Sequence, residues 1–261
     1  MRPIIFCGFR HRGKTTFIKR VIEAVKGEGY KVSVIKHVGG GLKLEDRDTA
    51  RFIDSGADVS IGYGDTLITT YERSEGFTGK IELRGVLHEL IVKSKGDFVL
   101  IEGFKSYSGP IPRIVFGNSK EEILSIADRM TVGYTGIGAG DYKINIPYIP
   151  FNLEGKELFK VIKKLSVPFV ADLDCGECGY PDCMDFTLAM LSGKESIKKC
   201  VPMQGEVLLR LNGKPVYLKG FVRDILRGVI EGFVSNLHGY EEGDVQIYIR
   251  KIREKDREVG I

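Results

Sequence analysis

A loop close to the N-terminus has the residue types and spacing that bind nucleotide phosphates. Gly8-Phe-Arg-His-Arg-Gly13-Lys14-Thr15 fits the pattern G-x-x-x-x-G-K-[ST], directly after an apolar strand pattern and before a helical one. In such a loop, backbone N–H groups surround phosphate oxygens, and the helix N-terminus adds its positive dipole end. We expect Lys14 to reach the β- and γ-phosphates and the Thr15 hydroxyl to bind Mg²⁺. The predicted nucleotide-binding residues of the loop are Gly8, Arg10, His11, Arg12, Gly13, Lys14, Thr15 and Thr16.

A magnesium site of this kind also needs a carboxylate. Asp97-Phe-Val-Leu-Ile-Glu102 reads as a buried strand that ends in an acid, and a parallel position beside the first strand would bring Glu102 near Thr15. Lys14 and Glu102 are therefore the candidate catalytic residues, and Thr15 and Glu102 the candidate Mg²⁺ ligands. The alternative for Glu102 is a surface carboxylate at a strand end. Asp48 is a further candidate for the nucleotide site, or an ordinary helix N-cap.

The base of the nucleotide is not specified by spacing. An Asn-Lys-x-Asp motif, which would read guanine, is absent, and Asn118-Ser-Lys-Glu is a poor match to it. From the residues alone, GTP and ATP therefore remain equal alternatives.

Four of the five cysteines could form a metal centre: Cys175, Cys178, Cys183 and Cys200. Clustered cysteines in a cytosolic chain more often bind metal than form disulfides. Structural zinc usually takes two separated Cys-x-x-Cys pairs, whereas here three thiols crowd together and one comes from afar, which favours a four-iron, four-sulfur cluster. Zinc and free thiols are the alternatives. Cys7 reads as a small buried residue and not as a ligand.

The elements that must position these residues alternate between strand and helix patterns, which predicts an α/β fold with a mostly parallel sheet, a P-loop NTPase. The predicted strands are 3–7, 31–36, 59–63, 67–71, 98–102, 113–116 and 130–134. The predicted helices are 14–28, 48–55, 80–93, 120–127 and 154–164. In the helix over 80–93, the residues expected on one core-facing side are Leu83, Val86, Leu87, Leu90 and Ile91.

The pattern changes after this region, and we expect three domains: a nucleotide-binding domain over 1–165, a four-cysteine module over 166–204 and a small α+β unit over 205–261. The cysteine module shows little apolar periodicity beyond a short helix over 186–191. In the last unit we expect a hairpin around Asn212-Gly213, an amphipathic helix over 221–237 and a strand over 245–249. So small a unit buries only a marginal core and should pack on a neighbour or a second copy.

Composition excludes some classes of partner. The chain has 261 residues, 43% of them hydrophobic and 28% charged, and a formal net charge of +4 without a long basic block. This distribution argues against a nucleic-acid partner. No apolar run approaches the length of a membrane helix, and the N-terminus lacks a secretory cleavage site, so we expect a cytoplasmic protein without a membrane partner.

Residues 1–165 resemble the molybdopterin-guanine dinucleotide biosynthesis protein B (MobB) family. The resemblance rests on the phosphate loop together with four further segments: Lys36-His37, Asp48-Thr49-Ala-Arg51, Ser55-Gly56-Ala57 and Asp97-Phe-Val-Leu-Ile-Glu102-Gly103-Phe104-Lys105. It implies a GTP-binding accessory protein with slow GTPase activity, which works beside a molybdopterin guanylyltransferase and serves molybdenum or tungsten apo-enzymes. It also implies a homodimer. His37 reads as a packed residue at a strand end rather than as a catalytic one.

The cysteine segment resembles the iron-sulfur domain of corrinoid iron-sulfur proteins and of ferredoxin-like electron-transport subunits. The shared features are Cys175-Gly-Glu-Cys178-Gly-Tyr-Pro-Asp-Cys183, a helix, Gly193 and a late cysteine. The resemblance supports a 4Fe-4S cluster on Cys175, Cys178, Cys183 and Cys200.

Two other functions remain open on the sequence. A nucleotide-gated metallocentre chaperone or electron donor would share the phosphate loop but act on a different metalloenzyme. A small-molecule kinase is the weaker alternative, because nothing besides the phosphate loop suggests a base for an acceptor hydroxyl.

Overall fold

The computed structural model describes residues 1–37, 55, 59–63, 68–72, 80–204, 207, 209–211, 214–241, 243, 245 and 247. The predicted helix over 48–55, apart from Ser55, and the predicted turn at Asn212-Gly213 lie outside these residues, as does most of the predicted strand over 245–249. The chain divides into two compact units, Met1–Gly220 and Phe221–Ile261. The predicted domain boundaries after residues 165 and 204 stay predictions.

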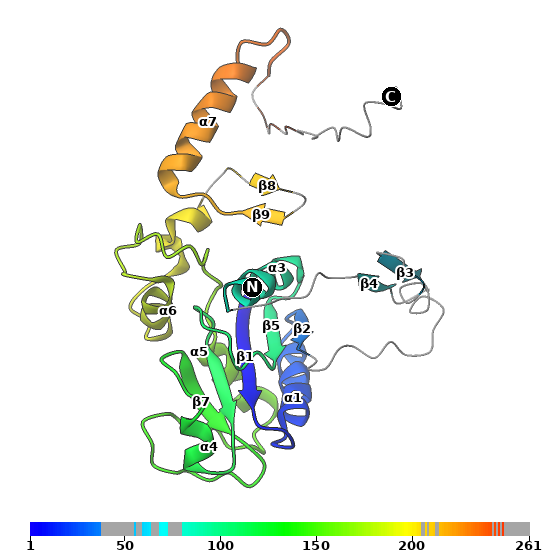
Figure 1. Ribbon diagram of the computed structural model, residues 1–261, viewed down its shortest axis with the longest axis vertical. Helices are drawn as coiled ribbons and strands as arrows, with labels where there is room; N and C mark the ends of the chain where they lie inside the picture. Colours follow the sequence, from blue (N-terminus) through cyan, green and yellow to red (C-terminus); the bar gives the residue numbers. More distant parts are fainter. Residues whose placement is uncertain are drawn as a thin grey trace. The chain divides into compact units, whose positions relative to one another are not determined.

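A parallel sheet of five strands forms the centre of the first unit, in the order β2-β5-β1-β6-β7 (Figure 1). The strands are β1 (Arg2–Gly8), β2 (Val32–Lys36), β5 (Phe98–Glu102), β6 (Arg113–Phe116) and β7 (Thr131–Thr135). All four neighbouring pairs are parallel. The predicted α/β class with a mostly parallel sheet is therefore confirmed.

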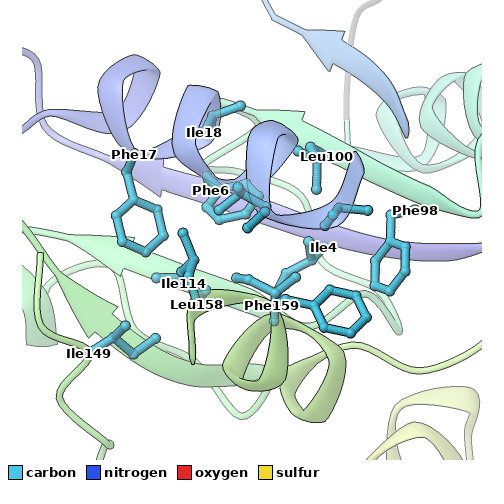
Figure 2. Close-up of a cluster of buried hydrophobic side chains, with 14 of the residues drawn as sticks. Ile4, Phe6, Phe17, Ile18, Phe98, Leu100, Ile114, Ile149, Leu158 and Phe159 are labelled. Carbon is cyan, nitrogen blue, oxygen red and sulfur yellow. The ribbon is translucent and has the colours of Figure 1, made fainter. Parts of the chain in front are cut away.

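One face of the sheet is covered by α1 (Lys14–Gly27) and α5 (Gly155–Leu165). Successive side chains of a strand point to opposite faces of the sheet. In β1, Ile4 and Phe6 point to the face that α1 and α5 cover. Figure 2 shows them packed with Phe17 of α1 and with side chains of β5, β6 and α5. The helix patterns predicted at 14–28 and 154–164 thus correspond to helices that bury their apolar sides here.

The opposite face is covered by α3 (Lys80–Lys93) and by the short α4 (Lys120–Leu124), which ends three residues before the predicted limit. Leu87 and Ile91 of α3 are fully buried with Ile5 of β1 and with side chains of β5. The prediction that Leu90 belongs to the core was wrong, because its side chain is 38% exposed. Leu90 lies at the margin of the apolar stripe, where periodicity alone cannot decide burial.

Two predicted strands lie outside the parallel sheet. β3 (Val59–Tyr63) and β4 (Ile68–Glu72) pair with each other in antiparallel orientation, as do the short strands β8 (Leu209–Leu211) and β9 (Lys214–Val216). The ranges predicted as strands over 59–63 and 67–71 are thus close to the observed ones, but they form a hairpin rather than additions to the main sheet. β8 and β9, on either side of Asn212-Gly213, pair as predicted for a hairpin.

The cysteine segment has an apolar core of its own, which the sequence did not predict. It contains α6 (Cys183–Leu191) and the 3₁₀ turns η1 (Ile197–Lys199) and η2 (Val201–Gln204). Phe186 and Met190 of α6 pack with Val170, Cys183 and Cys200. Cys183 and Cys200 are therefore part of a small hydrophobic cluster, and apolar side chains form the rest of that cluster.

The second unit contains α7 (Gly220–Val234), apart from the first residue of this helix, which belongs to the first unit. The helix was predicted over 221–237, so it begins one residue earlier and ends three residues earlier than predicted. Its apolar side carries exposed side chains at four-residue spacing: Phe221, Ile225, Val229 and Phe233.

Among the residues the structure describes, no helix is both long and apolar enough to cross a lipid bilayer.

Two leucines on α3 offer a matched test of this packing. Leu87→Ala should lower the free energy of unfolding by about 2–5 kcal/mol, because it leaves a cavity between the helix and the sheet. Leu90→Ala should cost less than about 1 kcal/mol, since Leu90 is partly exposed. Urea unfolding followed by circular dichroism measures both, and equal losses for the two variants would contradict the orientation of α3.

Candidate functional site

The phosphate loop joins β1 to α1, and its backbone has the shape that its sequence predicts. Gly13 is the N-cap of α1 and has a φ of 82°, in the left-handed region that favours glycine. A Cβ atom at Gly13 would lie 2.6 Å from the ring of Phe151, which covers the loop. Lack of space and backbone conformation both require glycine at this position.

Lys14 points back over the loop. Its ammonium donates hydrogen bonds to the carbonyl oxygens of Phe9 at 2.5 Å and Gly8 at 3.5 Å. Partial burial lowers the pKa of Lys14, although the nearby Glu102 carboxylate opposes this effect. The amino group therefore lies where the loop would surround a phosphate group.

Thr15 and Glu102 are in contact, as the prediction of neighbouring parallel strands required. The Thr15 hydroxyl lies 3.0 and 3.3 Å from the two carboxylate oxygens of Glu102. Pairing of β1 with β5 places Phe6 opposite Glu102, so the acid ends its strand beside the start of the loop. Lys36 of β2 lies 3.4 Å from the same carboxylate. A hydroxyl and a carboxylate in contact are suitable ligands, directly or through water, for Mg²⁺.

The remaining predicted loop residues have different positions. Arg10, His11 and Thr16 are exposed, and His11 has a φ of 56°. The Arg12 guanidinium forms two hydrogen bonds with the carboxylate of Glu122 on α4, at 2.6 and 3.0 Å. The Arg12 side chain thus binds α4, and only the Arg12 backbone N–H is expected to contact a phosphate.

Glu122 was not predicted, because nothing in the sequence connects it with the loop. Its hydrogen bonds with Arg12 and with the backbone N–H of Asn118 lower its pKa to about 2. Asp48 lies outside the described residues. His37 is exposed, and its ring lies 5.2 Å from that of Phe104, so it packs at a strand end as the sequence indicated.

All four predicted cysteine ligands line one pocket in the first unit. Cys175 and Cys178 are partly exposed, whereas Cys183 and Cys200 are buried. The segment over 172–179, which lines much of the pocket, contains four residues with left-handed φ values: Asp172, Asp174, Gly176 and Gly179. The backbone N–H of Gly179 donates to the carbonyl of Gly176 at 2.8 Å, which closes a tight turn around Cys178.

A backbone N–H group is directed at one of the buried sulfurs. Asp174 N–H donates to Cys183 Sγ at 3.3 Å, and the backbone N–H groups of Ala171 and Met203 act to lower the pKa of Cys200. Cys183 is also the first residue of α6, a position that favours a thiolate. Burial is the larger effect, however: it raises the pKa of Cys183 to about 12, and it also raises the pKa of Cys200.

This donor set fits a tetrathiolate centre. The four thiols converge on one pocket, and an N–H···S hydrogen bond such as that to Cys183 stabilises a thiolate bound to metal. The carboxylates of Asp172 and Asp174 also lie near Cys183 Sγ, but both form ion pairs with Arg84. These two carboxylates are therefore not counted as ligands.

Two arginines attach the cysteine module to the helices and loops around the sheet. Arg84 of α3 pairs with Asp172 and Asp174, and Arg129, just before β7, pairs with Asp182 and Asp185. Asp182 is the N-cap of α6. Neither arginine was predicted, because each pair joins residues far apart in the sequence.

Comparison with known proteins identifies two matching families. Residues 4–131 match the family described as "Molybdopterin guanine dinucleotide synthesis protein B", and residues 172–202 match the family described as "Putative Fe-S cluster". The first range includes the phosphate loop and Glu102, and the second includes all four clustered cysteines.

Three relatives show how these matches extend along the chain. A Methanocaldococcus jannaschii protein named "Putative molybdopterin-guanine dinucleotide biosynthesis adapter protein" is 28% identical over 260 residues, which cover 97% of this chain and 100% of that one. A Bacillus subtilis protein named "Probable molybdopterin-guanine dinucleotide biosynthesis adapter protein" is 36% identical over 127 residues, 46% of this chain and 68% of that one. One component of an ion-translocating oxidoreductase complex from Buchnera aphidicola is 44% identical over 55 residues, 18% of this chain and 32% of that one.

The burial of the cysteines predicts an order of thiol reactivity. In metal-free, reduced protein at pH 7, maleimide should modify Cys175 and Cys178 at least about tenfold faster than Cys183, because Cys183 is buried and has a raised pKa. Cys7, fully buried in β1 and with its pKa raised to about 11, is the internal control and should react slowly. Peptide mass spectrometry over time gives the order, and early modification of Cys183 would contradict this description of the pocket.

Proposed function

Because the chain belongs to the molybdopterin guanine dinucleotide synthesis protein B family, as its resemblance predicted, we propose that it is an adapter protein of molybdopterin-guanine dinucleotide biosynthesis. In this proposal it binds GTP at the phosphate loop, hydrolyses it slowly and holds an iron-sulfur cluster on its four cysteines. The observation that carries the proposal is the match with the M. jannaschii relative, which extends through nearly the whole chain and so includes both sites.

The nucleotide half is supported by the geometry of the loop. Lys14 would bind the phosphates, while the loop residues around Gly13 would supply backbone N–H groups. Mg²⁺, when bound, would neutralise phosphate charge. The Thr15 hydroxyl and the Glu102 carboxylate, already 3.0 Å apart, would hold it directly and through water, respectively. GTP is preferred over ATP on the family's description alone, since it names a guanine dinucleotide.

The cysteine half is supported by the common pocket and by the match over 172–202. Cys175, Cys178, Cys183 and Cys200 would hold a 4Fe-4S cluster, which supplies one-electron chemistry when bound. Zinc remains the alternative metal. The chain's own residues would bury two of the four ligands and donate a backbone N–H to the Cys183 sulfur.

The partners in this proposal are a molybdopterin guanylyltransferase and the molybdenum or tungsten apo-enzymes that receive the finished cofactor. The protein would act in the cytoplasm and as a homodimer. The iron-sulfur module would connect nucleotide binding with a redox partner or with one of these enzymes.

A second candidate function is favoured by the cysteine segment. Its similarity to a component of an ion-translocating oxidoreductase complex supports an electron donor to another metalloenzyme. Direct association with a purified molybdopterin guanylyltransferase would favour the first function. ATP-dependent reduction of a corrinoid or nickel centre would favour the second.

Substitution of the loop lysine tests the nucleotide site. Lys14→Ala should weaken Mg·GTP binding by about 10- to 100-fold, because it removes charge-assisted hydrogen bonds to phosphate. Lys26→Ala, at an exposed position near the far end of α1, is the matched control and should leave affinity unchanged. Isothermal titration calorimetry with GTP and with ATP gives both affinities, and a Lys14→Ala affinity equal to that of the unmodified chain would contradict the proposed site.

A further inference from the structure

Helix α3 packs on the central sheet and also contacts the cysteine module. Leu87 and Ile91 are buried against Ile5 of β1 and against Val99 and Ile101 of β5. β1 leads into the phosphate loop, and β5 ends in Glu102. Arg84 and His88, one turn apart on the same helix, contact the cysteine module instead.

Arg84 begins an unbroken series of hydrogen bonds that ends at a cysteine sulfur. Its guanidinium bonds to both carboxylate oxygens of Asp172 and, at 2.9 Å, to Asp174. Asp174 then contacts Cys183 twice: its carboxylate accepts from the Cys183 N–H at 2.8 Å, and its own N–H donates to Cys183 Sγ at 3.3 Å.

The two aspartates are in a conformation that needs support. Asp172 and Asp174 have φ values of 58° and 46°, in a region that residues other than glycine seldom occupy. The Asp172 side chain is only 3% exposed, so its charge depends on Arg84 for compensation. Arg84 therefore holds the backbone that directs the Asp174 N–H at Cys183.

His88 provides a second contact between α3 and the cysteine module. The His88 ring lies 5.2 Å from the ring of Phe169 in the module. It also meets the ring of Tyr217 edge to face at 5.3 Å, and Tyr217, which follows the module in the chain, packs against the apolar cluster that contains Cys200. Burial lowers the pKa of His88, with a smaller contribution from Arg84, and this favours the neutral ring, which packs as an aromatic group. A displacement of α3 would thus affect both buried cysteines.

The same helix connects to the strand that ends in Glu102. After α3 ends at Lys93, four residues connect it to β5, whose last residue, Glu102, contacts Thr15. The first of them, Ser94, still bonds to the carbonyls of Leu90 and Ile91, and the last, Asp97, donates to the carbonyl of Lys31. The connection is short and hydrogen-bonded at both ends, so α3 and β5 are expected to move together.

We propose that α3 couples the cysteine site to the nucleotide site and that Arg84 is the positioning residue through which the coupling passes. This inference rests on the proposed function, because it requires both a cluster and a bound nucleotide. A bound cluster would accept one electron from a one-electron donor such as a reduced iron-sulfur protein or dithionite, and the added negative charge would strengthen the N–H···S hydrogen bond from Asp174. Arg84 transmits the resulting shift of the aspartates to α3. Coupling between binding sites is reciprocal, so nucleotide binding must change the reduction potential of the cluster in turn.

The test uses full-length, cluster-loaded protein prepared without oxygen. The affinity for a non-hydrolysable GTP analogue is measured with the cluster oxidised and with the cluster reduced by dithionite, and the two states are verified by electron paramagnetic resonance. We expect the two affinities to differ by a factor of about five or more. Arg84→Lys keeps the positive charge beside Asp172 but loses the planar guanidinium group that bonds to both carboxylate oxygens. It should reduce this factor to less than about two.

Two further variants separate coupling from folding. Arg129→Lys is the matched control, because Arg129 forms the same kind of double ion pair with the module but does not lie on α3, and the factor should persist. The double variant Arg84→Met with Asp172→Asn removes the buried charge together with its partner, and it should lose the coupling while the cluster remains bound.

The outcomes distinguish this inference from the proposed function. Equal affinities in the two redox states of unmodified protein would overturn the coupling and leave the function intact. Equal losses in Arg84→Lys and Arg129→Lys would overturn the route through α3. Failure of unmodified protein to hold iron or to bind the GTP analogue would overturn the proposed function, and the coupling with it.

Discussion

The pairing of β1 with β5 is the constraint on which the rest of the structure depends. It places Phe6 opposite Glu102, so that the phosphate loop and its acid start from the same edge of the sheet. Because both strands are buried on both faces, their alternate side chains organise two cores, one with α1 and α5 and the other with α3 and α4. The Thr15–Glu102 contact follows from this register rather than from any local signal.

The cysteine module depends on the sheet for its position. Its own apolar cluster is small, and the aspartates beside Cys183 are held by Arg84 and Arg129, which lie outside the module. A small segment with a limited core commonly gains stability from a bound metal. A metal centre on the four thiols would thus complete a segment that ion pairs have already fixed against α3 and the β6–β7 connection.

Local signals were sufficient for much of this arrangement. The phosphate loop, the five parallel strands and the clustered cysteines each depend on residues close together in the chain, and all three were predictable. The Arg12–Glu122 and Arg84–Asp172 pairs join residues about 110 and 88 positions apart, and no periodicity or spacing indicates such contacts. Leu90 shows the same limit within one helix, because its exposure depends on what packs beside α3. The residues of β3 and β4 form strands as predicted, but the strand pattern alone did not indicate that these two strands pair with each other and not with the main sheet.

The central claim is that one folded chain combines a phosphate-binding loop with an iron-sulfur centre. The most direct test is the content of iron, acid-labile sulfide and zinc in protein purified without oxygen. We expect about four irons and four sulfides per chain, held by Cys175, Cys178, Cys183 and Cys200. About one zinc per chain without sulfide would contradict this claim, and would make the module a structural zinc site attached to a nucleotide-binding adapter.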